Sequence, residues 1–203
     1  MPRQGPRRLD HDQVVAAAEQ VVDELGWDHM TMAALAGALG TTGPSLYNHV
    51  ASLEALRGEL QQRTMRLLGE ELVAAALARS GREGFLALAA AYRAFVRRHP
   101  NRYDGATRAP VDRHGMWAAS SRANGALLAV VRSYGVEPDD ALVAQLGAFA
   151  ALHGVVTLEV SGFLGEAVDP DELYDSVVAA VERQLTALAG EPVQRAPAAT
   201  SRT

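Results

Sequence analysis

The side chains best suited to chemistry lie between residues 31 and 49, where hydroxyl, phenol, amide and imidazole groups follow one another closely. The candidates are Thr31, Thr42, Gly43, Ser45, Tyr47, Asn48 and His49. A phenol and an imidazole beside an exposed helix N-terminus suit phosphate oxygens, and short hydroxyls reach either phosphates or base edges. This stretch therefore predicts contact with DNA, with an ordinary polar helix surface as the alternative.

Enzyme and metal chemistry find little support in the same residue inventory. Six histidines are scattered without pairs four residues apart, no Glu-x-x-His sequence occurs, and there is no Cys. A di-metal site in a helical bundle is built on Glu-x-x-His pairs. A Gly-rich phosphate loop and a nucleophile elbow are absent too. We therefore predict no metal, no cofactor and no enzyme.

The elements that position the polar stretch are two short helices joined by a tight turn, over residues 32–51. Leu35 and Leu39 form one apolar edge, and Gly40 can adopt the positive φ of a sharp turn. Thr31 can cap the first helix, and Thr41 or Thr42 the second. An Asp-x-x-Gln capping box at residues 10–13 begins an earlier helix that ends at Gly26, which completes a three-helix unit.

The remainder of the chain is also predicted to be helical. Helices are expected from Ser52 to about Ser80, from Phe85 to Arg98, from Asp112 to Tyr134, over 138–163 and over 170–188, with a connector or short helix at 101–110. No segment alternates like a strand, so the fold class is all-α. We expect a flexible arm at 1–10, a helix-turn-helix DNA-binding domain at 11–51, a connecting helix at 52–80, a ligand-binding and dimerisation helical bundle at 81–190 and a disordered tail at 191–203.

Charge argues against DNA binding unless it is segregated by face. The net charge is −5, and residues 1–50 hold three Arg against six carboxylates. Phosphate attraction dominates DNA affinity, so an acidic module is a poor reader. All six carboxylates lie in residues 10–28, however, whereas residues 29–53 contain none. There is no Lys, so every basic contact must come from Arg.

One apolar segment is long enough to cross a bilayer, at residues 141–165. Glu159 is its only formally charged residue, but its flanks are acidic and carry no basic anchors. We predict a buried helix rather than a membrane span. Without an apolar run near the N-terminus that could serve as a signal peptide, and without Cys, a cytoplasmic protein is expected.

Candidate ligand-binding residues lie in the C-terminal half. Aromatic and Met side chains at helical spacing either line a pocket or fill the core: Tyr92, Phe95, Met116, Trp117 and Phe149. His153 lies on an apolar seven-residue repeat, which favours a core or interface histidine over a ligand contact. Glu159, on the same helix, must be paired or face a wet cavity, so pocket and dimer interface are both open.

Residues 11–60 resemble the N-terminal domain of the tetracycline-repressor (TetR) family of transcriptional regulators. The resemblance rests on five segments: Val14–Ala18, Leu25–Gly26, Thr31–Ala36 with Leu39–Gly40, Pro44–Val50 and Ser52–Leu56. The C-terminal half resembles the variant named for a Trp-His-Gly motif, through Ala91–Phe95, His99–Pro100, Tyr103 and Leu152–Gly154. Three positions depart from the family pattern: Thr41 replaces an apolar residue, Leu53 a phosphate-binding Lys, and Leu152 the motif Trp.

The resemblance implies a homodimer, formed by helices near 141–164 and 170–189, that places two reading helices in successive major grooves of double-stranded operator DNA, about 34 Å apart. It also implies a small-molecule effector in the C-terminal domain. By position, Tyr47 and His49 match phosphate contacts, Thr31 matches a backbone contact at a helix cap, and Thr42, Gly43 and Ser45 match base-facing positions. The arm with Arg3, Arg7 and Arg8 would reach the minor groove.

The interpretation is a ligand-responsive regulator, most simply a repressor that a small molecule releases from its operator. A helical small-molecule or protein-binding module with weak or lost DNA binding is the alternative, motivated by the acidic charge and the missing Lys. An activator is also compatible with the sequence.

Overall fold

The computed structural model describes residues 9–190, and every regular element in that range is helical. The elements are α1 (His11–Leu25), the 3-10 helix η1 (Trp27–His29), α2 (Met32–Ala38), α3 (Gly43–Leu46), α4 (Leu53–Ala76), α5 (Gly81–Arg98), α6 (Pro100–Thr107), α7 (Arg113–Ser133), α8 (Pro138–Val160) and α9 (Pro170–Gly190). The predicted all-α class is confirmed. Arg7, Arg8, the rest of the predicted arm up to residue 8 and the predicted tail lie outside the described residues.

The N-terminal helices pack around a small core of their own, which we call the head (residues 9–50). Helix α1 begins with the predicted capping box: Asp10 Oδ1 accepts from Gln13 N at 2.8 Å, and Gln13 Oε1 accepts from Asp10 N at 3.0 Å. It ends at Gly26, whose φ is 90°. Apolar residues of α1, η1, α2 and α3 meet Leu56 and Leu60 of α4 in one cluster.

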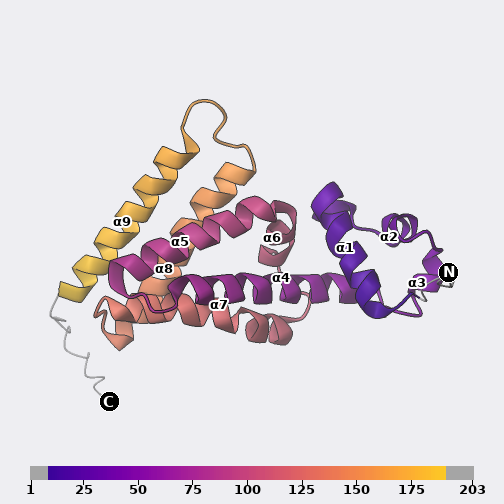
Figure 1. Cartoon of the computed structure of the whole chain (residues 1–203), viewed down its shortest axis with the longest axis horizontal. Helices are drawn as coiled ribbons and strands as arrows, with labels where there is room; N and C mark the ends of the chain where they lie inside the picture. The colour runs from indigo at the N-terminus through magenta and orange to yellow at the C-terminus, as the bar shows by residue number, and fades with distance from the viewer. Residues whose placement is uncertain (1–8, 191–203) are drawn as a thin grey trace, which may run out of the picture.

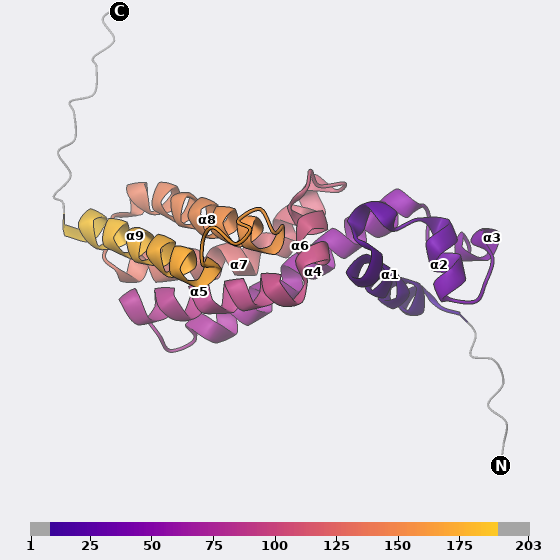
Figure 2. The same cartoon turned by 90° about the horizontal axis from the view of Figure 1, so that it is seen from above.

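Helix α4 runs from the head into the second group of helices, as Figures 1 and 2 show. Ser52 caps it as predicted, through a 2.9 Å hydrogen bond from Ala55 N. It ends at Ala76, before the predicted end near Ser80, because the chain takes a left-handed turn at Ala78, whose φ is 57°. Leu77, which directly follows the last residue of this helix, is 72% exposed.

The remaining helices form the C-terminal bundle (residues 81–190). Helices α5 and α7 pack along α4, and α8 and α9 pack against each other on the far side from the head (Figures 1 and 2). Tyr174 of α9 donates a buried 2.6 Å hydrogen bond to the carbonyl oxygen of Ala89 on α5, which ties the outermost helix to the core. A second, larger apolar cluster fills this bundle.

Helix α8 is buried on one side only. Its inner residues Ala144, Leu152 and Val156 are buried, whereas Leu142 and Leu146 are 58% and 55% exposed. The prediction of a buried helix is therefore wrong for the outer face. The physical reason is that α8 is apolar around most of its circumference while α5, α7 and α9 pack only on its inner side. By length and composition it is the one helix in residues 9–190 that could cross a bilayer, yet it is part of a helical bundle.

Candidate DNA-binding surface and ligand cavity

Helix α2, a tight turn and α3 form the predicted helix-turn-helix unit. Thr31 caps α2, because its Oγ1 accepts from Ala34 N at 3.1 Å. Gly40, with φ of 61°, turns the chain so that Thr41 N donates back to the carbonyl oxygen of Ala36 at 2.9 Å. The predicted helix cap at Thr31 and the predicted turn at Gly40 are confirmed.

Helix α3 is shorter than expected and its start differs from the prediction. It contains four residues and follows Thr42, which makes no side-chain hydrogen bond to the helix. A side-chain cap bonds to the second or third helical N–H. The second position here is Pro44, which has no N–H, and the third, Ser45 N, donates to the backbone oxygen of Thr42 at 3.0 Å. The predicted side-chain cap on α3 is therefore wrong.

The predicted DNA-contacting side chains gather on this unit, at the end of the molecule remote from α8 and α9 (Figures 1 and 2). Tyr47 is 57% exposed, Thr31, Thr42 and Asn48 are exposed, and Gly43, Ser45 and His49 are half-buried. Leu46, between them, is fully buried in the head core. The polar set thus stands on an anchored helix and remains available to a ligand.

Three carboxylates of α1 and η1 are turned toward the bundle. Glu19 pairs with Arg63 of α4 at 2.8 Å, Asp23 accepts from Arg102 Nε at 2.7 Å, and Asp28 pairs with Arg108. The guanidinium of Arg108 also lowers the pKa of Asp28, so this carboxyl stays ionised and paired. Because the partner arginines lie on α4 and α6, half of the head's negative charge is neutralised away from α2 and α3, which carry no carboxylate. This partial segregation by face weakens the charge argument against DNA binding.

Head and bundle meet where Trp27 of η1 packs on Gly105 of α6. A Cβ atom added at Gly105 would lie 2.0 Å from Trp27 Cε3 and 2.2 Å from Cδ2. Both residues are buried. The indole ring therefore rests directly on the α6 backbone, at a distance that only glycine permits.

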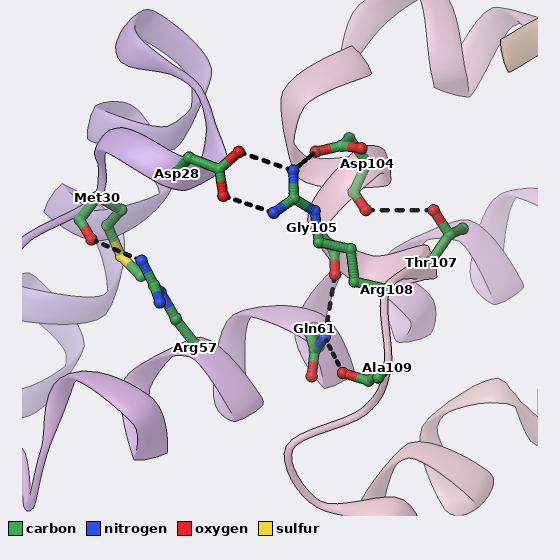
Figure 3. Close-up of polar contacts among 9 residues, drawn as sticks. All are labelled: Asp28, Met30, Arg57, Gln61, Asp104, Gly105, Thr107, Arg108 and Ala109. Carbon is green, nitrogen blue, oxygen red and sulfur yellow. Dashed lines mark hydrogen bonds and ion pairs between the residues drawn. The ribbon is translucent and has the colours of Figure 1, made fainter.

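Gln61 of α4 fixes the end of α6 at this junction (Figure 3). Its Nε2 donates to the carbonyl oxygens of Gly105 at 3.0 Å and Ala109 at 3.3 Å, and its Oε1 accepts from Val111 N at 3.0 Å. Gln61 is 2% exposed, whereas the Arg108 and Asp28 side chains are 42% and 70% exposed. Exposed ion pairs contribute about 0–1 kcal/mol, and a buried polar group left unpaired costs about 1–3 kcal/mol. Gln61 and the Trp27 contact therefore hold the junction more firmly than the ion pair does.

A mostly apolar cavity of about 220 Å³ lies between α4, α5, α7 and α8, and two of its lining residues, Asn124 and Phe149, are also exposed to solvent. Its wall consists of Met65, Leu68, Leu72, Leu88, Tyr92, Ser120, Ala123, Asn124, Leu127, Phe149 and Leu152. None of these residues carries a formal charge. Of the seven predicted ligand-binding residues, Tyr92 and Phe149 line this cavity, with their rings edge to face and their centroids 6.4 Å apart.

A chain of hydrogen bonds leads from the cavity wall to a separate groove. The hydroxyls of Tyr92 and Tyr103 are hydrogen-bonded to each other, and Tyr103 Oη lies 2.7 Å from His153 Nδ1. Burial lowers the pKa of His153 and raises that of Tyr103 to about 12, so both groups are neutral near pH 7. Tyr103 and His153 line a groove of about 440 Å³ between α6 and α8. His153 is hydrogen-bonded but half-buried and lines a groove, a position compatible with a core or interface histidine and with a ligand contact alike.

Glu159 is paired, as the sequence required for a carboxylate on this helix. Arg93 of α5 donates to both of its oxygens, at 2.8 and 3.0 Å, and also contacts Asp171 of α9 at 2.7 Å. The Arg93 guanidinium lies 4.4 Å from the centre of the Tyr174 ring. Glu159 lines neither the cavity nor the groove, so the structure gives it a role in joining α5, α8 and α9.

The other three candidates lie away from the cavity. Phe95 is fully buried in the bundle core and borders a charged groove beside α4. Met116 accepts a 3.6 Å contact from Ser120 without lining the cavity, and Trp117 is 78% exposed on α7. The placement of Trp117 in pocket or core is therefore wrong, because the part of α7 that faces the cavity begins one turn later, at Ser120.

Sequence reasoning missed most of the cavity wall and the whole junction. Leu68, Leu72 and Leu127 were recognisable only as apolar positions, and a leucine beside a cavity carries the same signal as one in a filled core. Gln61 has a usable signal, since it is a polar residue set among the apolar positions of the connecting helix. Gly105 has none, because its constraint comes from Trp27, far away in sequence.

The comparisons with known proteins agree with this architecture. The family model of the tetracyclin repressor-like C-terminal domain matches residues 85–181. The uncharacterized HTH-type transcriptional regulator Rv0681 of Mycobacterium tuberculosis is 37% identical over 187 residues, covering 89% of this chain and 85% of that protein.

Two solved structures share the fold. BioQ with its natural double-stranded DNA operator has a TM-score of 0.67 at 21% identity, covering 89% of this chain and 99% of that one. The Streptomyces coelicolor TetR family protein ActR in complex with (S)-DNPA has a TM-score of 0.65 at 19% identity, covering 91% of this chain and all of that one. The reading unit, the bundle that carries a cavity and the curated relative lead to one conclusion: the chain belongs to the TetR family of DNA-binding, helix-turn-helix transcriptional regulators.

Proposed function

We propose that this regulator is a homodimeric repressor whose hold on operator DNA is released by a small molecule bound in the bundle. The observation that carries the proposal is the junction, where a polar reading unit and a cavity-bearing bundle are joined through Trp27, Gly105 and Gln61. A regulator that acts on DNA in this way would work in the cytoplasm. The structures of BioQ with its operator and of ActR with (S)-DNPA support DNA and small molecules as the two classes of partner.

In this proposal, Tyr47 and His49 contact phosphates, Thr31 contacts the backbone beside the α2 cap, and Thr42, Gly43, Ser45 and Asn48 face the bases. Arg7 and Arg8 would add minor-groove contacts. Hydroxyls discriminate weakly between bases. Specificity would therefore depend strongly on the spacing of two heads, and a ligand that favours a different spacing would weaken binding.

The outer face of α8 supports the dimer. Leu142, Val143 and Leu146 are more than half exposed, and residues 141–158 carry no formal charge. A Cβ atom added at Gly147 or Gly154 would meet nothing within 4 Å, so a second helix can approach there closely. An apolar face of this kind on a protein that acts in water marks an interface. We place the partner's α8 and α9 against it.

The test of DNA contact is a fluorescence-anisotropy titration of the protein against DNA from upstream of its own gene. Tyr47→Phe combined with His49→Gln should lower operator affinity about ten-fold or more, because both phosphate contacts are lost in each subunit. The matched control makes the same chemical changes in the bundle, Tyr134→Phe with His114→Gln, and should bind like wild type. Unchanged affinity in the head variant would show that the assigned phosphate contacts are wrong.

The same titration decides between the repressor and the alternative of a module that has lost DNA binding. Wild-type protein should prefer one sequence and should bind more weakly as salt increases. Binding without any preferred sequence in a random-oligonucleotide selection would support the alternative. The ion pairs of Glu19, Asp23 and Asp28 weaken the case for that alternative, because they turn half of the head's acidic charge away from α2 and α3.

A further inference from the structure

The cavity in the bundle has no charged side chain in its wall. Its polar side chains are Tyr92, Ser120 and Asn124, and no Arg, Asp, Glu or His contributes to its wall. Burial raises the pKa of Tyr92 far above its ordinary value, so its hydroxyl stays neutral at any physiological pH. A charged ligand would therefore lose its hydration without meeting an opposite charge.

The charged groups elsewhere in the bundle core cannot supply a counter-ion. Arg93 already binds both oxygens of Glu159 and one oxygen of Asp171, and neither Arg93 nor Glu159 lines the cavity. Their side chains are only 12% and 10% exposed. Recruiting either one to a ligand would break a buried pair and leave its partner uncompensated.

The size and polarity of the cavity further limit which ligands it can bind. An apolar cavity of about 150 Å³ is enough to hold benzene, and this one measures about 220 Å³. Tyr92 and Phe149 present rings in edge-to-face geometry, which suits a further aromatic ring. Asn124 lines the cavity but is exposed to solvent, and its side chain has no hydrogen-bond partner among the described residues, so its amide can exchange water for one polar group of a ligand.

We infer that the effector is an uncharged, mostly apolar molecule somewhat larger than benzene, with one hydrogen-bonding group such as a hydroxyl or a carbonyl. Calling the ligand an effector rests on the proposed function. The class of ligand follows from the cavity alone and can be tested without DNA. It excludes carboxylates, phosphates and amines as ligands of this cavity.

Three probes of nearly equal size test the charge rule on the wild-type protein: benzyl alcohol, benzoate and benzylammonium. The chain contains five Met, of which Met65 lines the cavity and Met30 is buried in the head, so methyl-labelled methionine provides both a reporter and an internal reference. Benzyl alcohol should shift the Met65 methyl signal saturably and leave Met30 unchanged. The two ions should bind at least ten-fold more weakly. An ion that binds as tightly as the alcohol, or an alcohol that leaves Met65 unmoved, overturns the inference.

Variants locate the binding. Ala123→Leu adds side-chain volume at the cavity wall and should weaken benzyl alcohol binding at least ten-fold, whereas Ala118→Leu on the exposed side of α7 should leave it unchanged. Equal binding by the two variants would contradict the assignment to this cavity. Because these measurements contain no DNA, a protein that selects the neutral probe but keeps its operator affinity when saturated would support the ligand class and contradict the proposed ligand response.

Discussion

The head and the C-terminal bundle use their apolar residues in opposite ways. In the head most large apolar side chains are buried in one small core, and the groups proposed to bind DNA are mostly polar and lie on the outside. In the bundle, the features proposed to act are a mostly apolar cavity between four helices and an exposed apolar face on α8. One chain thus combines a small domain that presents polar groups on its surface with a larger domain that leaves a cavity and an apolar face uncovered, the places where we propose that a ligand and a second copy bind.

The largest effect is expected where the two regions touch. Gly105→Ala would place a methyl group against the Trp27 ring, which must move because the ring is buried. Overpacking of this kind costs about 3 kcal/mol. We therefore expect urea unfolding to show a loss of that size, with head and bundle beginning to unfold separately.

Gly125→Ala on α7 is the matched control for this change. A Cβ atom there would meet nothing within 4 Å. Since alanine is the better helix former, this variant should be stabilised by about 0.5–1 kcal/mol. If Gly105→Ala unfolds at the wild-type urea concentration, the Trp27 contact does not join the two regions tightly.

The two regions also differ in how much of them could be predicted. The head was largely predictable because its signals are local: the box at Asp10 and Gln13, the Thr31 cap and the Gly40 turn each act within a few residues. The cavity and the junction were not, because their residues come from several helices and acquire meaning only when the helices pack. The exposed α8 face was misjudged for a related reason, since an apolar pattern reports that a surface will be covered but not by which chain.

The second largest effect is expected at the exposed apolar face of α8. Leu146→Glu would put a charge in the middle of the exposed α8 face, where a dimer must exclude water. We expect the dimer dissociation constant to rise about 30-fold or more, which corresponds to about 2 kcal/mol. Analytical ultracentrifugation over a range of protein concentrations measures this change directly.

Leu77→Glu provides the control, because Leu77 is 72% exposed at the end of α4 and belongs to neither apolar cluster. It should remain as dimeric as wild type. Identical dissociation constants for the two variants, or a wild-type protein that is monomeric at micromolar concentration, would show that α8 does not form a dimer interface. The head should fold normally in both, since its core does not involve these positions.

The smallest effect is a pH dependence built into the head. The two ring nitrogens of His11 face acceptors: Nδ1 lies 2.9 Å from the carbonyl oxygen of His49, and Nε2 lies 3.0 Å from Glu59 Oε2. A neutral imidazole has one N–H and can donate to only one of them, whereas the imidazolium donates to both. These hydrogen bonds, to His49 first and then to Glu59, raise the pKa of His11, and the charges of Glu59 and Asp12 add to the effect.

A group whose pKa is raised by folding stabilises the protein below its unfolded pKa, here about 6.5, and loses that contribution as the pH rises through the folded value. The difference in unfolding free energy between wild type and His11→Gln should therefore be larger at about pH 6 than at about pH 8.5. The effect will be small, because the His11 side chain is 49% exposed and water screens the pair. His29→Gln, at an exposed position, should show no such trend. If the difference in unfolding free energy between wild type and His11→Gln does not change with pH, the charge of the His11 ring does not contribute to stability. The ring would then link the His49 backbone to Glu59 of α4 only as a neutral polar contact.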